Sequence, residues 1–110
     1  MDALLARLGA ARGAFVTAWN PCSRAMPWGW NDRMGQRLRA ATRRIPRAEG
    51  WGRARGWGEQ HLLLATDPRR AAVIARRFRQ NAIVVIRRGQ KARLVLLRAP
   101  QCSAPSRVSK

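Results

Sequence analysis

The fold is decided by the stretch DPRRAAVIARRF, which runs from Asp67 to Phe78. Aspartate is a good helix N-cap and proline fits the first helical position, so Asp67 and Pro68 together predict where a helix begins. Apolar residues then recur at helical spacing, with arginine filling most of the positions between them: Ala71, Ile74, Ala75 and Phe78. We therefore expect an amphipathic helix that ends near residues 80–81, with Val73 as a small exception on its opposite face.

Strands are expected on both sides of this helix. Short runs of apolar or β-branched residues, bounded by turn-forming residues, are typical of strands. Four such runs occur: residues 14–19, 61–66, 82–86 and 92–97. Between the last two, Arg88-Gly89-Gln90 predicts a hairpin turn.

A second helix is expected in the first half of the chain. Residues 22–30 have the composition of a loop with Pro27–Trp30 as its breaker, and Asn31 is a good N-cap for a helix that begins directly after it. One helical stripe then appears: Met34, Leu38, Ala41 and Ile45. Pro46 ends this helix. Residues 46–59 are rich in glycine, arginine and tryptophan, a composition that predicts a loop.

The resulting order is strand, helix, strand, helix, strand, strand. A weak strand near Arg47 or Trp51 would complete a β-α-β-β-α-β core with one added strand. We therefore expect an α+β fold in the ferredoxin-like split βαβ arrangement, with about four or five mostly antiparallel strands and two helices on one face. Residues 1–13 are expected to be an N-terminal arm or short helix, 14–98 a single domain, and 99–110 a disordered basic tail.

Arginine dominates the composition. The chain carries 23 Lys+Arg against 5 Asp+Glu, a formal net charge of +18 on 110 residues. Such a surface attracts polyanions at long range, which points to nucleic acid, an acidic protein or an anionic membrane surface as partner. A GC-rich coding sequence also produces arginine in place of lysine. The sequence leaves open how much of the charge is functional and how much is codon bias.

Several classes of protein are disfavoured. There is no run of about twenty apolar residues, so we expect no transmembrane segment, and the N-terminus lacks a signal-peptide pattern. Cys22 and Cys102 are far apart and His61 is the single histidine, which excludes the usual zinc sites. We expect two reduced thiols and a cytoplasmic protein with no metal and no cofactor. The oligomeric state is not indicated.

Four stretches together resemble the bacterial family called domain of unknown function 3293. They are Phe15–Pro21, the helix expected at Asn31, Glu49–Gly50 and Arg77–Ile83. The resemblance rests on their order and spacing, and it covers about residues 14–98. The chain differs from the family pattern in its short, arginine-rich middle loop and in Trp19, where a tyrosine is common. The resemblance implies the extent of the fold and no established activity.

Arginine and tryptophan form a candidate nucleic-acid interface. Arginine binds phosphates, and tryptophan stacks on bases when it is exposed. The candidate residues come from the two helices and from residues 53–57: Arg33, Arg37, Arg44, Arg53, Arg55, Trp57, Arg69, Arg70, Arg76 and Arg77. The structural alternative is that the arginines coat solvated helix faces and that Trp57 pins a loop onto the core.

A second candidate site is a polar pocket. It would unite four small polar residues of the family-like motifs: Asn20, Ser23, Asn31 and Asn81. The structural alternatives are an Asx turn at Asn20 and a helix C-cap at Asn81. A catalytic set of Cys22, Glu59 and His61 has nothing in the sequence to fix its geometry, so no catalytic residue is assigned.

The composition favours a small basic module that binds the backbone of nucleic acid, RNA rather than DNA, without catalysis. Sequence-specific DNA reading has no support, because no helix-turn-helix spacing is present. The alternative is a regulatory or protein-interaction domain that meets an acidic partner. A third hypothesis is an enzyme with a polar pocket near Asn20 and Asn81.

Overall fold

The computed structural model describes residues 2–54 and 57–97, and only the backbone of residues 51–54 and 57–58 within them. The tail expected at residues 99–110 lies outside the described residues. The helices are α1 (Asp2–Arg7), the short 3-10 helix η1 (Pro21–Ser23), α2 (Trp28–Ala41) and α3 (Pro68–Arg77). The strands are β1 (Arg12–Val16), β2 (Arg47–Ala54), β3 (Trp57–Leu64), β4 (Ala82–Arg87) and β5 (Arg93–Leu96).

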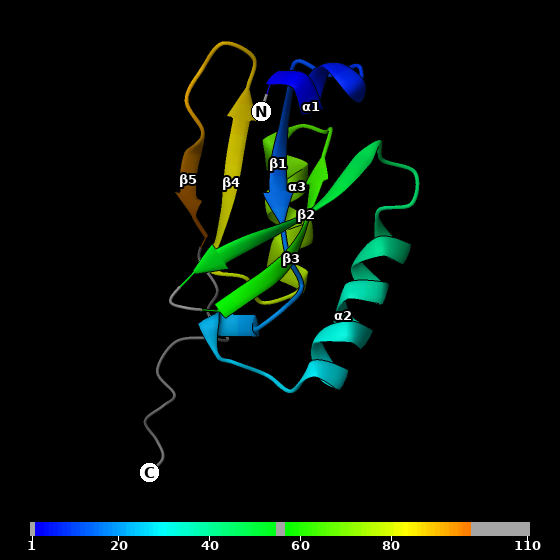
Figure 1. The fold of residues 1–110 in the computed structure, drawn as a ribbon, viewed down its shortest axis with the longest axis vertical. Helices are drawn as coiled ribbons and strands as arrows, with labels where there is room; N and C mark the ends of the chain where they lie inside the picture. The colour runs from blue at the N-terminus through cyan, green and yellow to red at the C-terminus, as the bar shows by residue number, and fades with distance from the viewer. Residues whose placement is uncertain (1, 55–56, 98–110) are drawn as a thin grey trace.

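The strands form one open sheet in the order β2-β3-β1-β4-β5, and every neighbouring pair is antiparallel (Figure 1). α2 connects β1 to β2, and α3 connects β3 to β4, so each crossover passes one intervening strand. This is the β-α-β-β-α-β order of the split βαβ arrangement, and β5 extends the sheet at one edge. The α+β fold expected from the sequence is confirmed.

The main core lies between the sheet and both long helices, on the side that we call the helix face. β1, β3 and β4 contribute Ala14, Val16, Leu62, Leu64, Ile83 and Val85 to it. α2 contributes Leu38, and α3 contributes Ala71, Ile74 and Ala75, all of them buried. The two helices therefore bury their apolar sides against the same side of the sheet.

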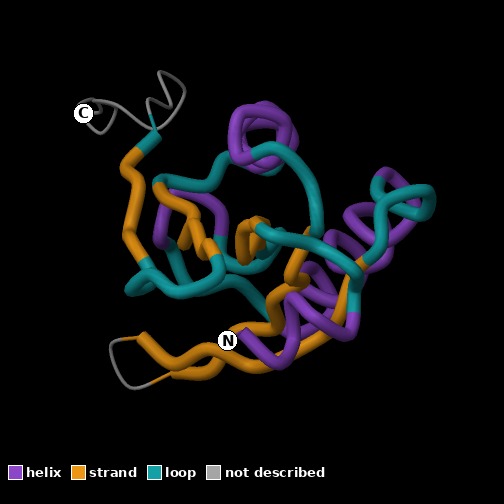
Figure 2. The backbone as a smooth tube through the Cα atoms, turned by 90° about the horizontal axis from the view of Figure 1, so that it is seen from above, coloured by secondary structure: helices purple, strands orange, loops and turns teal. Residues whose placement is uncertain are grey.

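A smaller core on the other face is covered by α1. Leu5 of α1 has no exposed surface and packs with Leu63 of β3 and Ile86 of β4. Figure 2 shows α1 and α3 on opposite sides of the central strands. The segment expected to be an arm or short helix is thus a helix held to the sheet by a buried leucine.

The prediction of a loop at residues 46–59 is wrong, because this stretch forms most of a β-hairpin. Its register runs from Arg47 opposite Leu64 to Ala54 opposite Trp57. Glycine lowers the strand propensity of this stretch, but β3 is already bonded to β1 and offers β2 a complete edge. Tertiary pairing thus overrides composition, and the weak strand considered near Arg47 or Trp51 is β2.

The expectation that Asn31 caps α2 is also wrong. The helix begins at Trp28, and the backbone N–H of Asn31 already donates to the carbonyl of Pro27 at 3.1 Å. Most of the expected apolar stripe does face the core: Leu38 and Ile45 are buried and Met34 is partly buried, whereas Ala41 is exposed. The buried positions are Asn31, Gly35, Leu38 and, just past the helix, Thr42. The same side of α2 thus also buries polar and small residues, which hydrophobic periodicity does not indicate.

α3 begins as expected. The Asp67 carboxylate accepts a hydrogen bond from the backbone N–H of Arg69 at 2.9 Å, which confirms the N-cap. The helix ends at Arg77, earlier than expected, and the left-handed residue beyond it is Arg79, with φ of 56°. The interpretation of Asn81 as a left-handed C-cap is therefore wrong. The β4–β5 hairpin is confirmed, with Gly89 at φ of 74° in its turn.

Two further expectations concern the environment of the chain. Among the helices of the described residues, none is long and apolar enough to cross a membrane. Cys22 is disulfide-bonded, which corrects the expectation of a reduced thiol at this position. Cys102 lies outside the described residues. The cytoplasmic location stays a prediction and loses the support that reduced thiols gave it.

Gly13 is required where β1 approaches β3. A Cβ atom at this position would lie 2.6 Å from the Leu64 carbonyl oxygen, a backbone atom held in the sheet. We expect Gly13→Ala to lower the free energy of unfolding by about 1–3 kcal/mol in urea denaturation. The matched control is Gly50→Ala in β2, where a Cβ meets nothing within 4 Å. That variant should be neutral or stabilised by about 0.5–1 kcal/mol, and equal losses in both would contradict the packing argument.

Asp67 makes stability depend on pH. The hydrogen bond from the Arg69 backbone, assisted by the charge of Arg12, holds the pKa of Asp67 below its ordinary value despite some desolvation. A lowered folded pKa stabilises the protein above the ordinary aspartate pKa of about 3.9, and that contribution is lost as pH falls through the folded value. Asp67→Asn keeps an acceptor for the Arg69 N–H but does not titrate. Between about pH 4 and pH 2, we therefore expect the urea midpoint of this variant to fall less than that of the wild type. Parallel pH profiles would contradict this.

Candidate nucleic-acid interface and polar cluster

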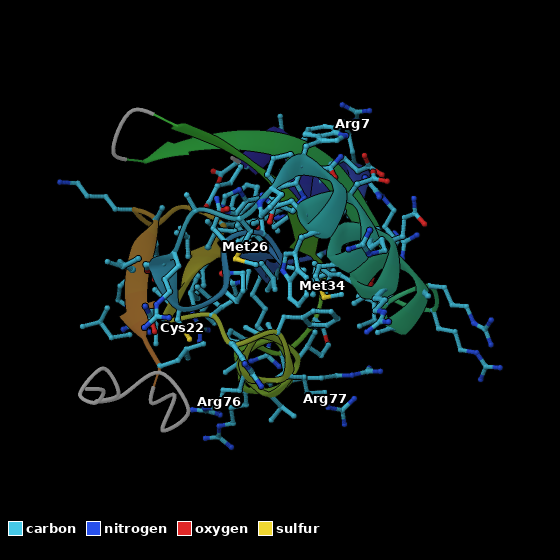
Figure 3. The ribbon with its side chains drawn as sticks, turned by 90° about the horizontal axis from the view of Figure 1, so that it is seen from below. Arg7, Cys22, Met26, Met34, Arg76 and Arg77 are labelled. Atoms are coloured by element: carbon cyan, nitrogen blue, oxygen red, sulfur yellow. The ribbon has the colours of Figure 1, made fainter. Side chains whose placement is uncertain are left out.

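Except for Arg39, the arginines of the two long helices are exposed to solvent. Because the apolar residues turn toward the sheet, arginine occupies the outward positions. The exposed members of the candidate interface are Arg33 and Arg37 of α2, Arg44 beyond its end, and Arg69, Arg70, Arg76 and Arg77 of α3. Figure 3 shows Arg76 and Arg77 extending from α3 away from the body of the protein. We call the seven exposed arginines from Arg33 to Arg77 given above the helix arginines.

All five carboxylates of the chain have partners elsewhere. None of them binds the side chain of a helix arginine. Asp2 accepts from the Gly89 N–H, Asp32 from Gln36, Glu49 from Arg39, and Glu59 from Asn20. Asp67 accepts from the backbone N–H of Arg69 and pairs with the Arg12 side chain. Within the described residues, the ion pairs are Arg39–Glu49 at 3.0 Å and Arg12–Asp67 at 3.5 Å. Within this part of the chain, none of the helix arginines therefore forms an ion pair, although Asp67 lies near Arg69.

Arg39 has a structural role, unlike the helix arginines. It is partly buried and joins α2 to the edge of the sheet, because its guanidinium donates to Glu49 of β2 and to Gln60 of β3. The hydrogen bond from Arg39 lowers the pKa of Glu49, with partial desolvation opposing it and the charges of Arg39 and Arg47 adding to it. Arg39 was not among the candidate residues, and its role is to hold α2 in place.

For three candidate residues the structure describes no side chain. Arg55 lies outside the described residues. Arg53 belongs to β2 and Trp57 to β3, but only their backbones are described. Their assignment to a nucleic-acid interface stays a prediction, now on a hairpin instead of a loop.

Two exposed tryptophans were not among the residues that the sequence pattern indicated. Trp28 is 65% exposed and Trp30 is 36% exposed, both in the first turn of α2. Trp28 meets the buried Trp19 edge to face, with ring centroids 5.2 Å apart and planes at 88°. The neighbouring proline and glycine made this segment look like a loop. Exposure of an aromatic ring depends on tertiary packing, so no local signal marks these two residues.

The candidate pocket residues Asn20 and Asn31 form a closed pair. The Asn31 side chain accepts from the Asn20 backbone N–H and donates to the Asn20 side-chain oxygen, both at 3.0 Å. The Asn20 amide nitrogen then donates to the Glu59 carboxylate at 2.8 Å. Both asparagines are 5% exposed. This cluster links the segment after β1 to α2 and β3.

The other two residues of the candidate pocket form a separate pair. The Asn81 side-chain amide donates to the Ser23 hydroxyl at 2.8 Å at an exposed position. Beside them, the Gln80 side chain donates to the carbonyl of Trp19 at 3.0 Å. These contacts tie the segment after β1 to the segment after α3. The structure thus brings the four residues together as two pairs, and their hydrogen bonds run within the protein.

Catalytic and metal chemistry find little support here. The Glu59 carboxylate binds Asn20, and the His61 ring contacts the Glu59 backbone carbonyl at 3.0 Å instead of its carboxylate. In the part of the chain that is described, no group of three or more His, Cys, Asp or Glu residues is placed to hold a metal ion. The hydrogen bonds of the polar cluster tie α2 to the segment after β1 and to β3.

The family described as Protein of unknown function (DUF3293) matches residues 16–83, which extend from the end of β1 to the start of β4. No curated protein and no solved structure matches this chain. The matched span contains the polar cluster and the helix arginines. The rest of β4, the hairpin turn and β5 lie beyond it.

The Asn20–Asn31 pair is expected to stabilise the fold. Asn31→Ala leaves the buried Asn20 backbone N–H without its acceptor, at about 1–3 kcal/mol for each unsatisfied group. We expect a loss of about 2–4 kcal/mol in the free energy of unfolding, measured by urea denaturation. Ser23→Ala, which removes an exposed hydrogen bond, is the control and should cost less than about 1 kcal/mol. An Asn31→Ala protein as stable as the control would show that the pair is not structural.

Proposed function

Because the chain belongs to the DUF3293 family, whose description names no activity, we propose its function from its own surface. The protein binds nucleic acid through the phosphate backbone, RNA rather than DNA, and does so without catalysis. The observation that carries this proposal is the set of helix arginines, exposed on one side of the sheet while all five carboxylates are engaged elsewhere.

The geometry suits a backbone contact. Arginine presents a planar fork of donors that matches phosphate oxygens, and α2 and α3 present several such forks outward from one face of the sheet. About six phosphate contacts would give a salt slope of roughly 4 log units on a single strand. Phosphate contacts read no base sequence, so binding should depend weakly on sequence.

The exposed tryptophans support a preference for single strands. Base stacking on aromatic rings requires unpaired bases, which RNA loops and single strands supply. Trp28 leaves most of its surface to solvent, and its edge-to-face contact with Trp19 holds it at the start of α2. Arg33 lies more than one turn further along α2 and is exposed. A strand that runs along the helix arginines would meet both kinds of contact.

The proposal is tested by a matched pair of single substitutions. Arg76→Gln removes one helix arginine, and Arg7→Gln removes one exposed charge on α1, which lies on the opposite side in Figure 3. Binding of fluorescein-labelled single-stranded RNA is measured by anisotropy across a salt series, with duplex DNA compared at each salt. We expect Arg76→Gln to lower the salt slope by about 0.7–0.9 and Arg7→Gln to leave it unchanged.

Two outcomes would contradict the proposal. The first is no retention of either RNA or DNA at low salt. The second is an equal effect of the two substitutions, which would mean that net charge matters and the helix arginines do not. Copurification of one acidic protein, with nucleic acid absent after nuclease treatment and high salt, would instead support the protein-interaction alternative.

A further inference from the structure

A shallow cavity lies beside the turn that joins β4 to β5, at the end of the sheet where β1 begins. Its volume is about 80 Å³, and it is lined by Val85, Arg87, Gln90, Lys91 and Arg93. Three of these lining residues are cationic, and none is acidic. The turn stands at the top of the molecule in Figure 1.

The register of the sheet explains why these charges converge. Arg93 pairs with Val85, whose side chain is buried in the core of the helix face. Because side chains alternate along a strand, Arg87 points to the same face as Val85. Two arginines from adjacent strands therefore flank one cavity, and Lys91 joins them from the turn.

No carboxylate lines this cavity. Within the described residues, Arg87, Lys91 and Arg93 form no ion pair. Asp67 is already bonded to the Arg69 backbone and lies 3.5 Å from Arg12. Its pKa is lowered mainly by that hydrogen bond and also by the charges of Arg12, Arg69 and Arg87, so Asp67 offsets part of the charge of Arg87 without pairing with it.

The turn that carries these residues is held in place from the opposite face. The Arg88 side chain donates to the Ala10 carbonyl at 2.8 Å, and its backbone N–H donates to Ala11 at 3.0 Å. The Gly89 N–H lies 3.3 Å from both carboxylate oxygens of Asp2 in α1. The cationic residues thus stand on a backbone that is ordered before any ligand binds, which lowers the entropic cost of binding.

We propose that Arg87, Lys91 and Arg93 bind one phosphate group in this cavity, with the Gln90 amide as a further donor. Pockets that enclose whole small molecules measure roughly 300–1,000 Å³, so a cavity of about 80 Å³ takes a single anionic group. Arginine forks match phosphate oxygens in pairs, and lysine adds a point charge. These residues lie beyond the span that matches the family.

The inference deepens the proposed function, and it rests on that function for the claim that the bound phosphate is part of RNA. In RNA this phosphate is either an internal phosphodiester or a terminal phosphate. Either would place the end of an RNA strand or one turn of its backbone next to Arg69 and Arg70 at the start of α3. The cavity would then anchor a strand that continues along the helix arginines.

The first test uses inorganic phosphate alone. Arg87→Gln/Arg93→Gln removes two charges from the cavity, and Arg7→Gln/Arg24→Gln removes two exposed charges away from it. Phosphate is titrated into each full-length protein while NMR monitors the backbone and arginine Nε–H signals. We expect saturable shifts at residues 85–93 in the wild type and the control, and binding at least about tenfold weaker in the cavity variant. Equal binding by the two variants, or no saturable shift in the wild type, overturns the site.

The second test distinguishes the sources. Single-stranded RNA is offered with a 5′-hydroxyl or a 5′-phosphate. A terminal source predicts that the cavity variant loses the advantage of the phosphorylated strand. A backbone source predicts that it weakens both strands equally and lowers the salt slope by about 1.4 for two contacts. RNA affinities equal to those of the control overturn the RNA contact. Phosphate binding without any RNA binding would sink the proposed function and leave the phosphate site standing.

Discussion

The pairing of β1 with both β3 and β4 is the interaction on which the rest of the structure depends. β2 reaches the sheet only through β3, and β5 only through β4, so the two halves of the sheet meet at β1. Gly13 permits this meeting, because the Leu64 carbonyl lies where a side chain would begin. β1 is covered on both faces, with Ala14 and Val16 in the core of the helix face and Phe15 in the core under α1. Once β1 is placed, α2 and α3 must cross on the same side.

This arrangement also decides where the positive charge is left. Four of the five acidic residues hold parts of the fold together: Asp67 caps α3, Glu49 binds Arg39, Glu59 binds Asn20, and Asp2 binds the β4–β5 turn. Within the described residues, neither the helix arginines nor Arg87, Lys91 and Arg93 form an ion pair. A positively charged surface without ion pairs attracts phosphate, whether selection for function or codon bias produced the arginines. The spatial separation of the acids, more than the number of arginines, defines the candidate surfaces.

The two long helices differ in how far their own sequence predicts them. α3 has a cap, a proline and an apolar stripe within twelve residues, and the structure agrees with each of them up to Arg77. α2 carries its important contacts on polar and small residues, since Asn31 binds Asn20 and Gly35 lies close to Trp19. The same asparagines suggested a pocket for a ligand, and the structure shows them bonded to each other. A polar residue on a buried helix face looks like a cap or a ligand group until its partner is known.

The sequence by itself determined the α+β class, α3 and its N-cap, the β4–β5 hairpin and the excess of positive charge. These features depend on short-range spacing, backbone preference and composition, which neighbouring residues carry. Only the tertiary structure decided that residues 47–54 are a strand, that Asn31 binds Asn20, that Trp28 is exposed, and that Arg87 and Arg93 share a cavity. Each of these depends on partners distant in the chain or on strand register, such as Glu59 for Asn20 and Val85 for Arg93. These contacts form, and stabilise the protein, only when β1 brings the two halves of the sheet together.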